Sequence, residues 1–213
     1  MTTHSENLMR VQEELWYLIH DEDVNQVLEA MIDKMNEVGD SSERIKQWRQ
    51  EAKAYIPDEP EYDEKYWVAA YILYTNMENF KDLFDRLDNI SSEISELESQ
   101  IEESEREQEY LENRIEDLQY ELKSLREEYE EDEEESEDEE DNYEEDEEED
   151  EDWDEDEDEA IVDLRYQIEE LEEELKNEKD DYEETLDRFY ELEDDKKHLL
   201  WEIMERAEQL VAS

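Results

Sequence analysis

The sequence predicts an all-α protein: a small N-terminal helical domain followed by a long antiparallel coiled-coil hairpin with a highly acidic tip. Glycine occurs once and proline twice in 213 residues, so most turn chemistry is missing and helix is the default structure. Apolar residues follow helical spacing near the N-terminus and heptad spacing in two later stretches. Residues 130–159 separate these two stretches and contain 26 Asp or Glu and no Lys or Arg.

Residues 1–79 are expected to form the helical domain, which begins with two short helices. Ser5 is a suitable N-cap for the first helix. Asp23 is expected to begin the second helix, because Gln26 three residues later completes a capping box, and Gly39 marks the end of that helix. The apolar residues of the second helix recur every three or four positions, as burial of one side requires.

A third helix is expected after Ser41 or Ser42 and should stop before Pro57, because the residue before proline disfavours the α conformation. From about Asp63 the stretch KYWVAAYILYTNMENF is apolar almost all round, which suits a helix packed on several sides. This fourth helix need not end before the first heptad stretch, because apolar positions step by four and three from Leu83 onward. The core of the domain is expected to include Trp16, Trp48, Trp67, Ala70, Tyr71 and Tyr74.

Two coiled-coil arms are expected, at 80–129 and 160–213, on either side of an acidic connector at 130–159. Heptad spacing sustained for more than six repeats is typical of a coiled coil. Arms of similar length favour an antiparallel hairpin, each arm about 75 Å long at 1.5 Å per residue. The expected seam residues are Leu87, Ile90, Ile94, Leu97, Ile101, Ser104, Gln108, Leu111, Ile115, Leu118, Leu122, Leu125 and Tyr129, and then Ile161, Leu164, Ile168, Leu171, Leu175, Glu178, Tyr182, Thr185, Phe189, Leu192, Lys196, Leu199, Ile203, Arg206 and Leu210.

The register of this hairpin can be tested against its polar interruptions. With Tyr129 opposite Ile161, the polar seam residues of one arm face those of the other, which supports pairing within one chain. That register places Ser104 and Gln108 beside Tyr182 and Thr185, with Glu178 close by. It also places Arg106 near Glu183 and Glu184, Arg188 near Glu102 and Glu103, and Lys197 near Glu93.

The formal net charge of −60 bounds the function. Such a chain repels nucleic acid and anionic membrane, so its expected partners are basic proteins or surfaces that hold a polyanion. The magnitude exceeds what solubility requires of a small domain. The N-terminus lacks a basic region followed by an apolar run, so we expect a cytoplasmic protein, located in the host cytoplasm if the source is viral.

Catalytic and cofactor chemistry is not expected. Cysteine is absent, and the histidines His4, His20 and His198 are scattered. The chain contains no phosphate-binding glycine loop, no nucleophile elbow and no HExxH motif. The run from Asp152 to Asp156 is similar to the start of a calcium loop, but Glu157 stands where the turn needs glycine. We therefore expect no enzyme activity, no cofactor and no specific metal site.

Carboxylates on both arms and in the connector are the expected partner-binding residues. The arms carry 36 acids over about 75 Å, about one per 2 Å, while duplex DNA carries one charge per ~1.7 Å. A two-helix rod is about 20 Å wide, close to a duplex. The candidate residues are Glu102, Glu103, Glu109, Glu112, Glu116, Asp117, Glu133, Glu134, Asp138, Tyr143, Asp146, Asp150, Trp153, Asp156, Glu169, Glu172, Glu173, Asp180 and Glu183.

In composition and in helical, carboxylate-rich character the chain resembles the DNA-mimic inhibitors of phages and plasmids, such as antirestriction and anti-CRISPR proteins. No shared motif accompanies the likeness, so no residue is assigned from it. The resemblance implies an inhibitor that serves the evasion of phage defence. It would occupy the DNA-binding groove of a restriction, CRISPR, nuclease or repair protein. Its mechanism would be competition, driven by counterion release and by Lys or Arg pairing with fixed carboxylates.

Two alternatives stay open. Acids interspersed with Tyr143 and Trp153 are similar to the acidic stretches of histone chaperones, which implies sequestration of a basic protein through the connector. A coiled-coil scaffold is the other alternative. The chain is expected to be a monomer, or a homodimer formed through the apolar YWVAAYILY segment of the N-terminal domain.

Overall fold

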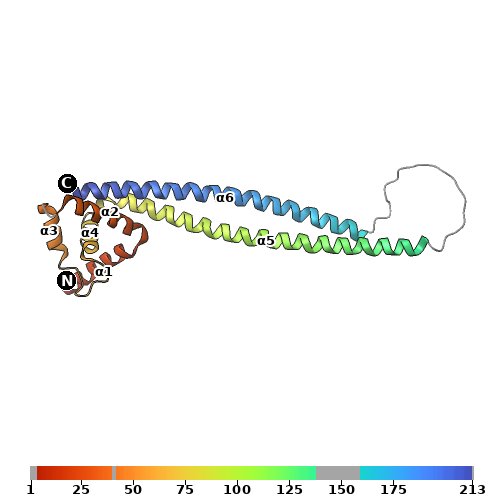
Figure 1. The fold of residues 1–213 in the computed structure, drawn as a ribbon, viewed down its shortest axis with the longest axis horizontal. Coiled ribbons are helices and arrows are strands. Elements are labelled where there is room, and N and C mark those ends of the chain that lie inside the picture. Colours follow the sequence, from red (N-terminus) through yellow and green to blue (C-terminus); the bar gives the residue numbers. More distant parts are fainter. Residues whose placement is uncertain (1–3, 40–41, 138–158, 213) are drawn as a thin grey trace. The chain divides into compact units, whose positions relative to one another are not determined.

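The computed structural model describes the backbone of residues 4–39, 42–137 and 159–212, and the side chains of 6–39, 42–128 and 159–212 (Figure 1). Every regular element in these ranges is helical, and none is a strand, so the all-α prediction is confirmed. The elements are α1 (His4–His20), α2 (Glu22–Val38), α3 (Glu43–Ala52), α4 (Glu64–Thr75), the 3-10 turn η1 (Met77–Asn79), α5 (Lys81–Glu137) and α6 (Glu159–Ala212).

The chain divides into two compact units. Unit 1 contains Met1–Ser95 and Tyr190–Ser213, and unit 2 contains Glu96–Phe189. Unit 1 therefore includes α1 to α4, the first residues of α5 and the last residues of α6. Unit 2 consists of the remaining parts of α5 and α6 and the segment between them.

The N-terminal ends of α1 and α2 differ from those expected from the sequence. Asp21, in extended conformation, accepts a 2.9 Å hydrogen bond from the Val24 amide and caps α2, so the prediction that Asp23 begins this helix is wrong. Capping at Asp21 places Glu22 and Asp23 in the first turn, where the helix dipole favours negative charge. Ser5 is also not an N-cap, because α1 begins at His4 and includes it.

Two other boundary predictions are confirmed. Gly39 ends α2 with a φ of 72°, a value that glycine adopts without strain, and its amide donates to the Met35 carbonyl. Ser42 caps α3 by accepting from the Ile45 amide at 3.3 Å. Helix α3 ends at Ala52, before Pro57, as expected.

Helices α4 and α5 are separate, although the sequence allowed one continuous helix. Helix α4 ends at Thr75, and η1 separates it from α5. The Thr75 hydroxyl donates to the Tyr71 and Ile72 carbonyls, and the Asn76 amide group donates to the Ile72 carbonyl at 2.8 Å. These polar side chains satisfy carbonyls at the helix end and so favour termination there.

The core of unit 1 combines residues from all of its helices. Trp67 and its neighbours in α4 are buried, so the apolar YWVAAYILY surface that suggested a homodimer is largely covered within the chain. Trp48 is also buried, but the expectation that Trp16 belongs to the core is wrong because its side chain is 43% exposed. The ends of α5 and α6 contribute Leu83, Leu87, Leu199, Leu200, Ile203, Ala207 and Val211 to this core.

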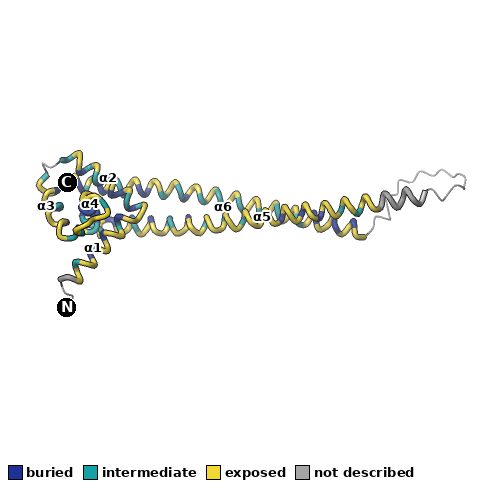
Figure 2. The backbone as a smooth tube through the Cα atoms, turned by 60° about the horizontal axis from the view of Figure 1, so that its bottom comes forward, coloured by how far each residue is buried: buried dark blue, intermediate teal, exposed yellow. Residues whose placement is uncertain are grey.

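In unit 2 the side chains at the seam of α5 face those of α6. Ile115 and Leu118 pack with Leu164 and Ile168, and four partly buried leucines adjoin this cluster. Residues 104 and 105 of α5 contact 178 and 182 of α6, whereas 115 and 118 pack with 164 and 168, so the helices run in opposite directions here. Figure 2 shows buried and half-buried residues alternating with exposed ones along both helices. Of the expected seam residues with described side chains, all are buried or half-buried except Arg206.

Candidate protein-binding surface

The carboxylates predicted as a binding surface lie on the outside of α5 and α6. Every one with a described side chain is exposed: Glu102, Glu103, Glu109, Glu112, Glu116, Asp117, Glu169, Glu172, Glu173, Asp180 and Glu183. Glu133 and Glu134 lie in α5, but their side chains are outside the described residues. The other candidates, Asp138, Tyr143, Asp146, Asp150, Trp153 and Asp156, lie wholly outside them.

One row of carboxylates follows α5 for nearly three heptads. Glu98 and Glu116 are its ends, and successive members are separated by four or three positions, so they share one side of the helix. All six members are exposed. The sequence-based selection missed Glu98 and Glu105, although the same spacing could have identified them. We call this set the α5 acidic row: Glu98, Glu102, Glu105, Glu109, Glu112 and Glu116.

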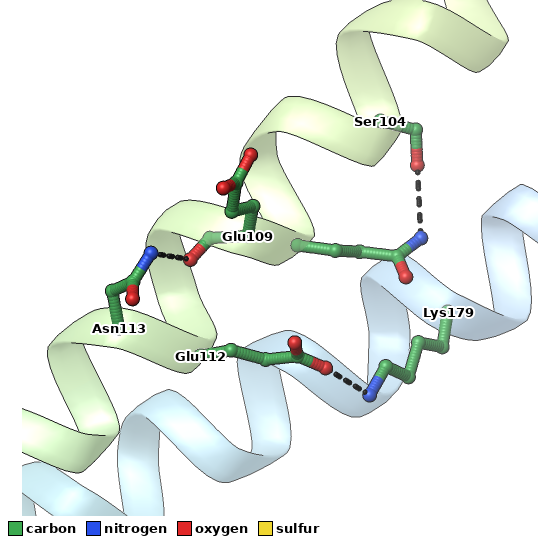
Figure 3. A network of polar contacts seen from close by, with 6 residues as sticks. Ser104, Glu109, Glu112, Asn113 and Lys179 are labelled. Carbon is green, nitrogen blue, oxygen red and sulfur yellow. Dashed lines mark hydrogen bonds and ion pairs between the residues drawn. The ribbon is translucent and has the colours of Figure 1, made fainter.

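Contacts restrain three carboxylates of the α5 acidic row. Glu112 forms a 2.8 Å ion pair with Lys179 of α6, which Figure 3 shows reaching from the neighbouring helix. Glu105 accepts a 3.0 Å hydrogen bond from the Tyr182 hydroxyl. Glu102 pairs with Arg106 one turn along α5. Such contacts reduce the conformational entropy that these side chains would lose when a partner binds.

Two bases that were expected near acids of the other arm form contacts within their own helix. Arg106 contacts Glu102 at 3.1 Å. Lys197 contacts Asp194 at 3.3 Å. Pairs within one helix are close at spacings of three and four residues, and both of these lysine and arginine side chains are largely exposed. The placement of Arg188 beside Glu102 stays a prediction.

A polar layer interrupts the apolar contact between α5 and α6. The Ser104 hydroxyl donates to Glu178 at 2.6 Å, and the Gln108 side-chain amide donates to the Ser104 oxygen at 3.4 Å. Tyr182 and Thr185 line the same shallow hollow of about 400 Å³. The predicted proximity of Ser104 to Glu178, Tyr182 and Thr185 is therefore confirmed, while the printed contact of Gln108 is with Ser104 on its own helix. Carboxylates also line this hollow, through Glu103, Glu107, Glu178 and Asp181.

The outer side of α6 adds a second acidic surface in unit 2. A hollow of about 750 Å³ is lined by Tyr166 and by acidic side chains of the same helix, Asp163, Glu169, Glu170 and Glu173. The residues of unit 2 whose side chains are described, 96–128 and 159–189, contain 26 acids and 8 bases. Carboxylates outnumber the nearby cations about threefold, so most of the negative charge is available to a partner.

Other kinds of site find no support in the described residues. No group of three or more His, Asp or Glu side chains in those parts of the chain is arranged to hold a metal ion. Across the same ranges, no helix has the length and apolar character needed to span a bilayer. No protein-family model matches the chain, and comparisons with curated proteins and with solved structures also return no match.

Proposed function

We propose that the protein is a DNA-mimic inhibitor that occupies the DNA-binding groove of a restriction, CRISPR, nuclease or repair protein. The observation that carries this proposal is the α5 acidic row, whose exposed carboxylates have helical spacing and lie on a regular backbone. A DNA-binding groove presents Lys and Arg at phosphate spacing, and these cations would pair with carboxylates whose positions are fixed before binding.

The proposed binding element is an antiparallel coiled-coil hairpin formed by α5 and α6, with an acidic tip at 130–159. Support comes from the buried seam residues, from the opposite directions of the two helices in unit 2 and from the polar layer around Ser104. Packing of apolar residues in the seam leaves the remaining sides of each helix free for acids. The hairpin therefore offers charge on both sides of a narrow helical pair.

The proposed mechanism is competition without catalysis. Lysine and arginine side chains of the target would exchange their DNA phosphates for carboxylates, and release of counterions would favour the complex at low salt. Partners would be basic grooves and basic proteins, while nucleic acid and anionic membrane would be repelled by the net charge of −60. Inhibition should therefore weaken as salt concentration increases.

Two variants with the same change in charge test the proposal. In the first, the α5 acidic row is changed from Glu to Gln at all six positions. In the second, the acids at 144–149 in the connector are changed to their amides, which removes the same number of charges. Each variant and the unaltered protein are immobilised and exposed to bacterial lysate, and bound proteins are eluted with duplex DNA or with polyphosphate of equal charge.

Mimicry predicts that DNA-processing enzymes bind the unaltered protein and the connector variant, and that duplex DNA elutes them better than polyphosphate. The row variant should lose them. If the connector variant alone loses its partners, and these are small basic proteins, then the protein is a sequestering binder that acts through 130–159. If neither substitution changes the captured proteins, the scaffold interpretation is favoured and mimicry is wrong.

A further inference from the structure

The outward side of α1 carries apolar and aromatic side chains that the core of unit 1 does not cover. Met9 and Tyr17 are each 58% exposed, and Trp16 is 43% exposed. Met9, Glu13, Trp16 and His20 follow one another at spacings of four, three and four, so they share one side of the helix. Clustered exposed aromatics in a soluble protein mark interaction surfaces more often than isolated ones do.

The rings in this area form a connected series. Trp16 stacks on His20 with a centroid distance of 3.8 Å, and Tyr17 meets Trp16 edge to face at 5.4 Å. His20 is edge-on to Tyr62 at 5.1 Å, and Tyr62 lies 5.7 Å from Tyr66. The series therefore joins α1 to the loop before α4 and to α4 itself.

Polar contacts fix the centre of this series. His20 Nδ1 lies 2.8 Å from the Trp16 carbonyl oxygen, and His20 Nε2 lies 3.6 Å from a Glu61 oxygen. The opposite side of α1 is anchored by the buried residues Leu15 and Ile19. Because both the backbone and the ring stack are held in place, a ligand of Trp16 would meet a surface that needs little ordering.

Carboxylates surround the rings. Glu13 precedes Trp16 and Tyr17 by three and four positions, and Glu14 is also exposed on α1. Glu61 adjoins His20, and Glu29 accepts a hydrogen bond from the Tyr66 hydroxyl. Arg10, whose guanidinium donates to Asn7, is the base that α1 contributes. Acid next to exposed indole and phenol faces favours a cationic ligand and disfavours phosphate or nucleic acid.

Arginine side chains already pack on aromatic rings at two other places in this protein. The guanidinium carbon of Arg44 lies 4.6 Å from the ring centroid of Trp48, and that of Arg206 lies 5.8 Å from the centroid of Phe80. Arginine is the cation that most often stacks on aromatic faces, because its guanidinium is planar and weakly hydrated. A second copy of this protein is a poor occupant, since two chains of net charge −60 repel each other.

We propose that the exposed surface of Met9, Glu13, Trp16, Tyr17 and His20 with Glu61, here called the α1 aromatic patch, binds an arginine side chain of a basic protein segment. The guanidinium packs on Trp16 or Tyr17 and pairs with the Glu13 carboxylate. The patch belongs to unit 1, whereas the proposed mimicry depends on unit 2, so this site is a separate determinant of partner choice.

The experiment follows each tryptophan separately by ¹⁹F NMR of protein labelled with fluorotryptophan. The five tryptophan signals are assigned by single Trp→Phe substitutions. The probe is a short peptide, acetyl-Gly-Arg-Gly-Arg-Gly-amide, with citrulline and lysine versions as controls. Titration at about 0.3 M NaCl screens diffuse attraction to the many other carboxylates. Trp201, which is 64% exposed on α6, is the matched control signal.

We expect the Trp16 signal to shift saturably with the arginine peptide, more weakly with lysine and not with citrulline, while the Trp201 signal stays unchanged. Glu13→Gln should weaken binding about fivefold or more, measured from the Trp16 signal, whereas Trp201→Phe should leave the Trp16 titration unchanged. Circular dichroism verifies that each variant is folded. Equal shifts of Trp16 and Trp201, an equal response to citrulline, or no shift of Trp16 would overturn the proposal. The outcome of this titration does not depend on whether duplex DNA displaces proteins from the α5 acidic row. Failure of this proposal can therefore be distinguished from failure of the proposed mimicry.

Discussion

The hydroxyl of Ser104 on α5 donates a 2.6 Å hydrogen bond to the carboxylate of Glu178 on α6. Both residues occupy seam positions, where leucine or isoleucine is the usual occupant, and both are half-buried. The pair lies between apolar contacts on either side along α5, at Ile94 and at Leu111. This polar pair therefore stabilises the two helices less than a pair of apolar residues would. It favours one register, because shifting the register would leave both groups without polar partners.

The first prediction concerns this hydrogen bond. Ser104→Ala removes the donor to a half-buried carboxylate and should lower the free energy of unfolding by about 1 kcal/mol. Changing both Ser104 and Glu178 to Leu fills the layer with apolar atoms and should raise stability instead. Urea unfolding followed by circular dichroism measures both changes. Ser124→Ala, at an exposed position of the same helix, should change stability little. A double leucine variant less stable than the unaltered protein would contradict this account.

The second prediction concerns the ion pair of Lys196 and Asp23 in unit 1. Their charged atoms lie 2.9 Å apart, and the side chains are 24% and 21% exposed. Lys196→Met should destabilise the protein by about 1 kcal/mol, because Asp23 loses its partner in a partly desolvated site. Lys197→Met is the control, since Lys197 is 67% exposed and should cost under about 0.5 kcal/mol. A double-mutant cycle with Asp23→Asn would give no coupling energy if the pair were unimportant.

The third prediction concerns alkaline pH. Burial raises the pKa of Tyr66, and the nearby Glu29 carboxylate raises it further. Burial first, and then the Glu51 carboxylate, likewise raise the pKa of Tyr71. The fold thus favours the neutral phenols. Their contribution to stability is complete below the unfolded pKa of about 10 and is lost as pH rises through the higher folded pKa.

Melting temperatures of the unaltered protein should accordingly fall between about pH 9 and pH 11. The double substitution Tyr66→Phe and Tyr71→Phe should reduce this fall. Tyr120→Phe serves as the control, because Tyr120 is 74% exposed on α5. Equal alkaline losses in all three proteins would show that other groups cause them.

The fourth prediction concerns salt. At low ionic strength the like charges of α5 and α6 repel, and about 0.5 M NaCl reduces the Debye length to a few ångströms. The melting temperature should therefore rise when NaCl is added to a dilute buffer. Differential scanning calorimetry at several salt concentrations measures the effect. A fall in melting temperature would mean that exposed ion pairs such as Lys179 with Glu112 contribute more to stability than repulsion takes away.

Much of the helical organisation was predictable because it depends on local spacing. The seam residues from Leu87 to Leu125 are buried or half-buried as their heptad positions indicate. The polar contacts of Ser104 with α6 were also predictable, because the apolar periodicity of both helices sets the register that brings polar residues together. The cap at Ser42 also depends on a contact only three residues long.

Other features depend on contacts that local spacing does not contain. Leu200, Ala207 and Val211 are buried outside the heptad seam, because this end of α6 packs on several helices of unit 1. Trp16 is a large apolar residue of a type that is usually buried, but other parts of unit 1 do not cover its side of α1. The acidic surface could be predicted from charge and spacing. The aromatic series through His20 could not, because Tyr62 is distant in sequence.

Unit 1 consists of two parts of the chain that are far apart in sequence, and this affects how the protein folds during synthesis. Leu28 and Met31 are synthesised long before Leu199 and Ile203, which share their core. A ribosome must therefore synthesise nearly all of both long helices before this core can close, because residues 96–189 lie between the two parts of unit 1. Until then the early helices expose apolar surface and are open to wrong associations. Closure also carries the loop entropy of the intervening chain, so formation of this core should be a late and comparatively slow folding step.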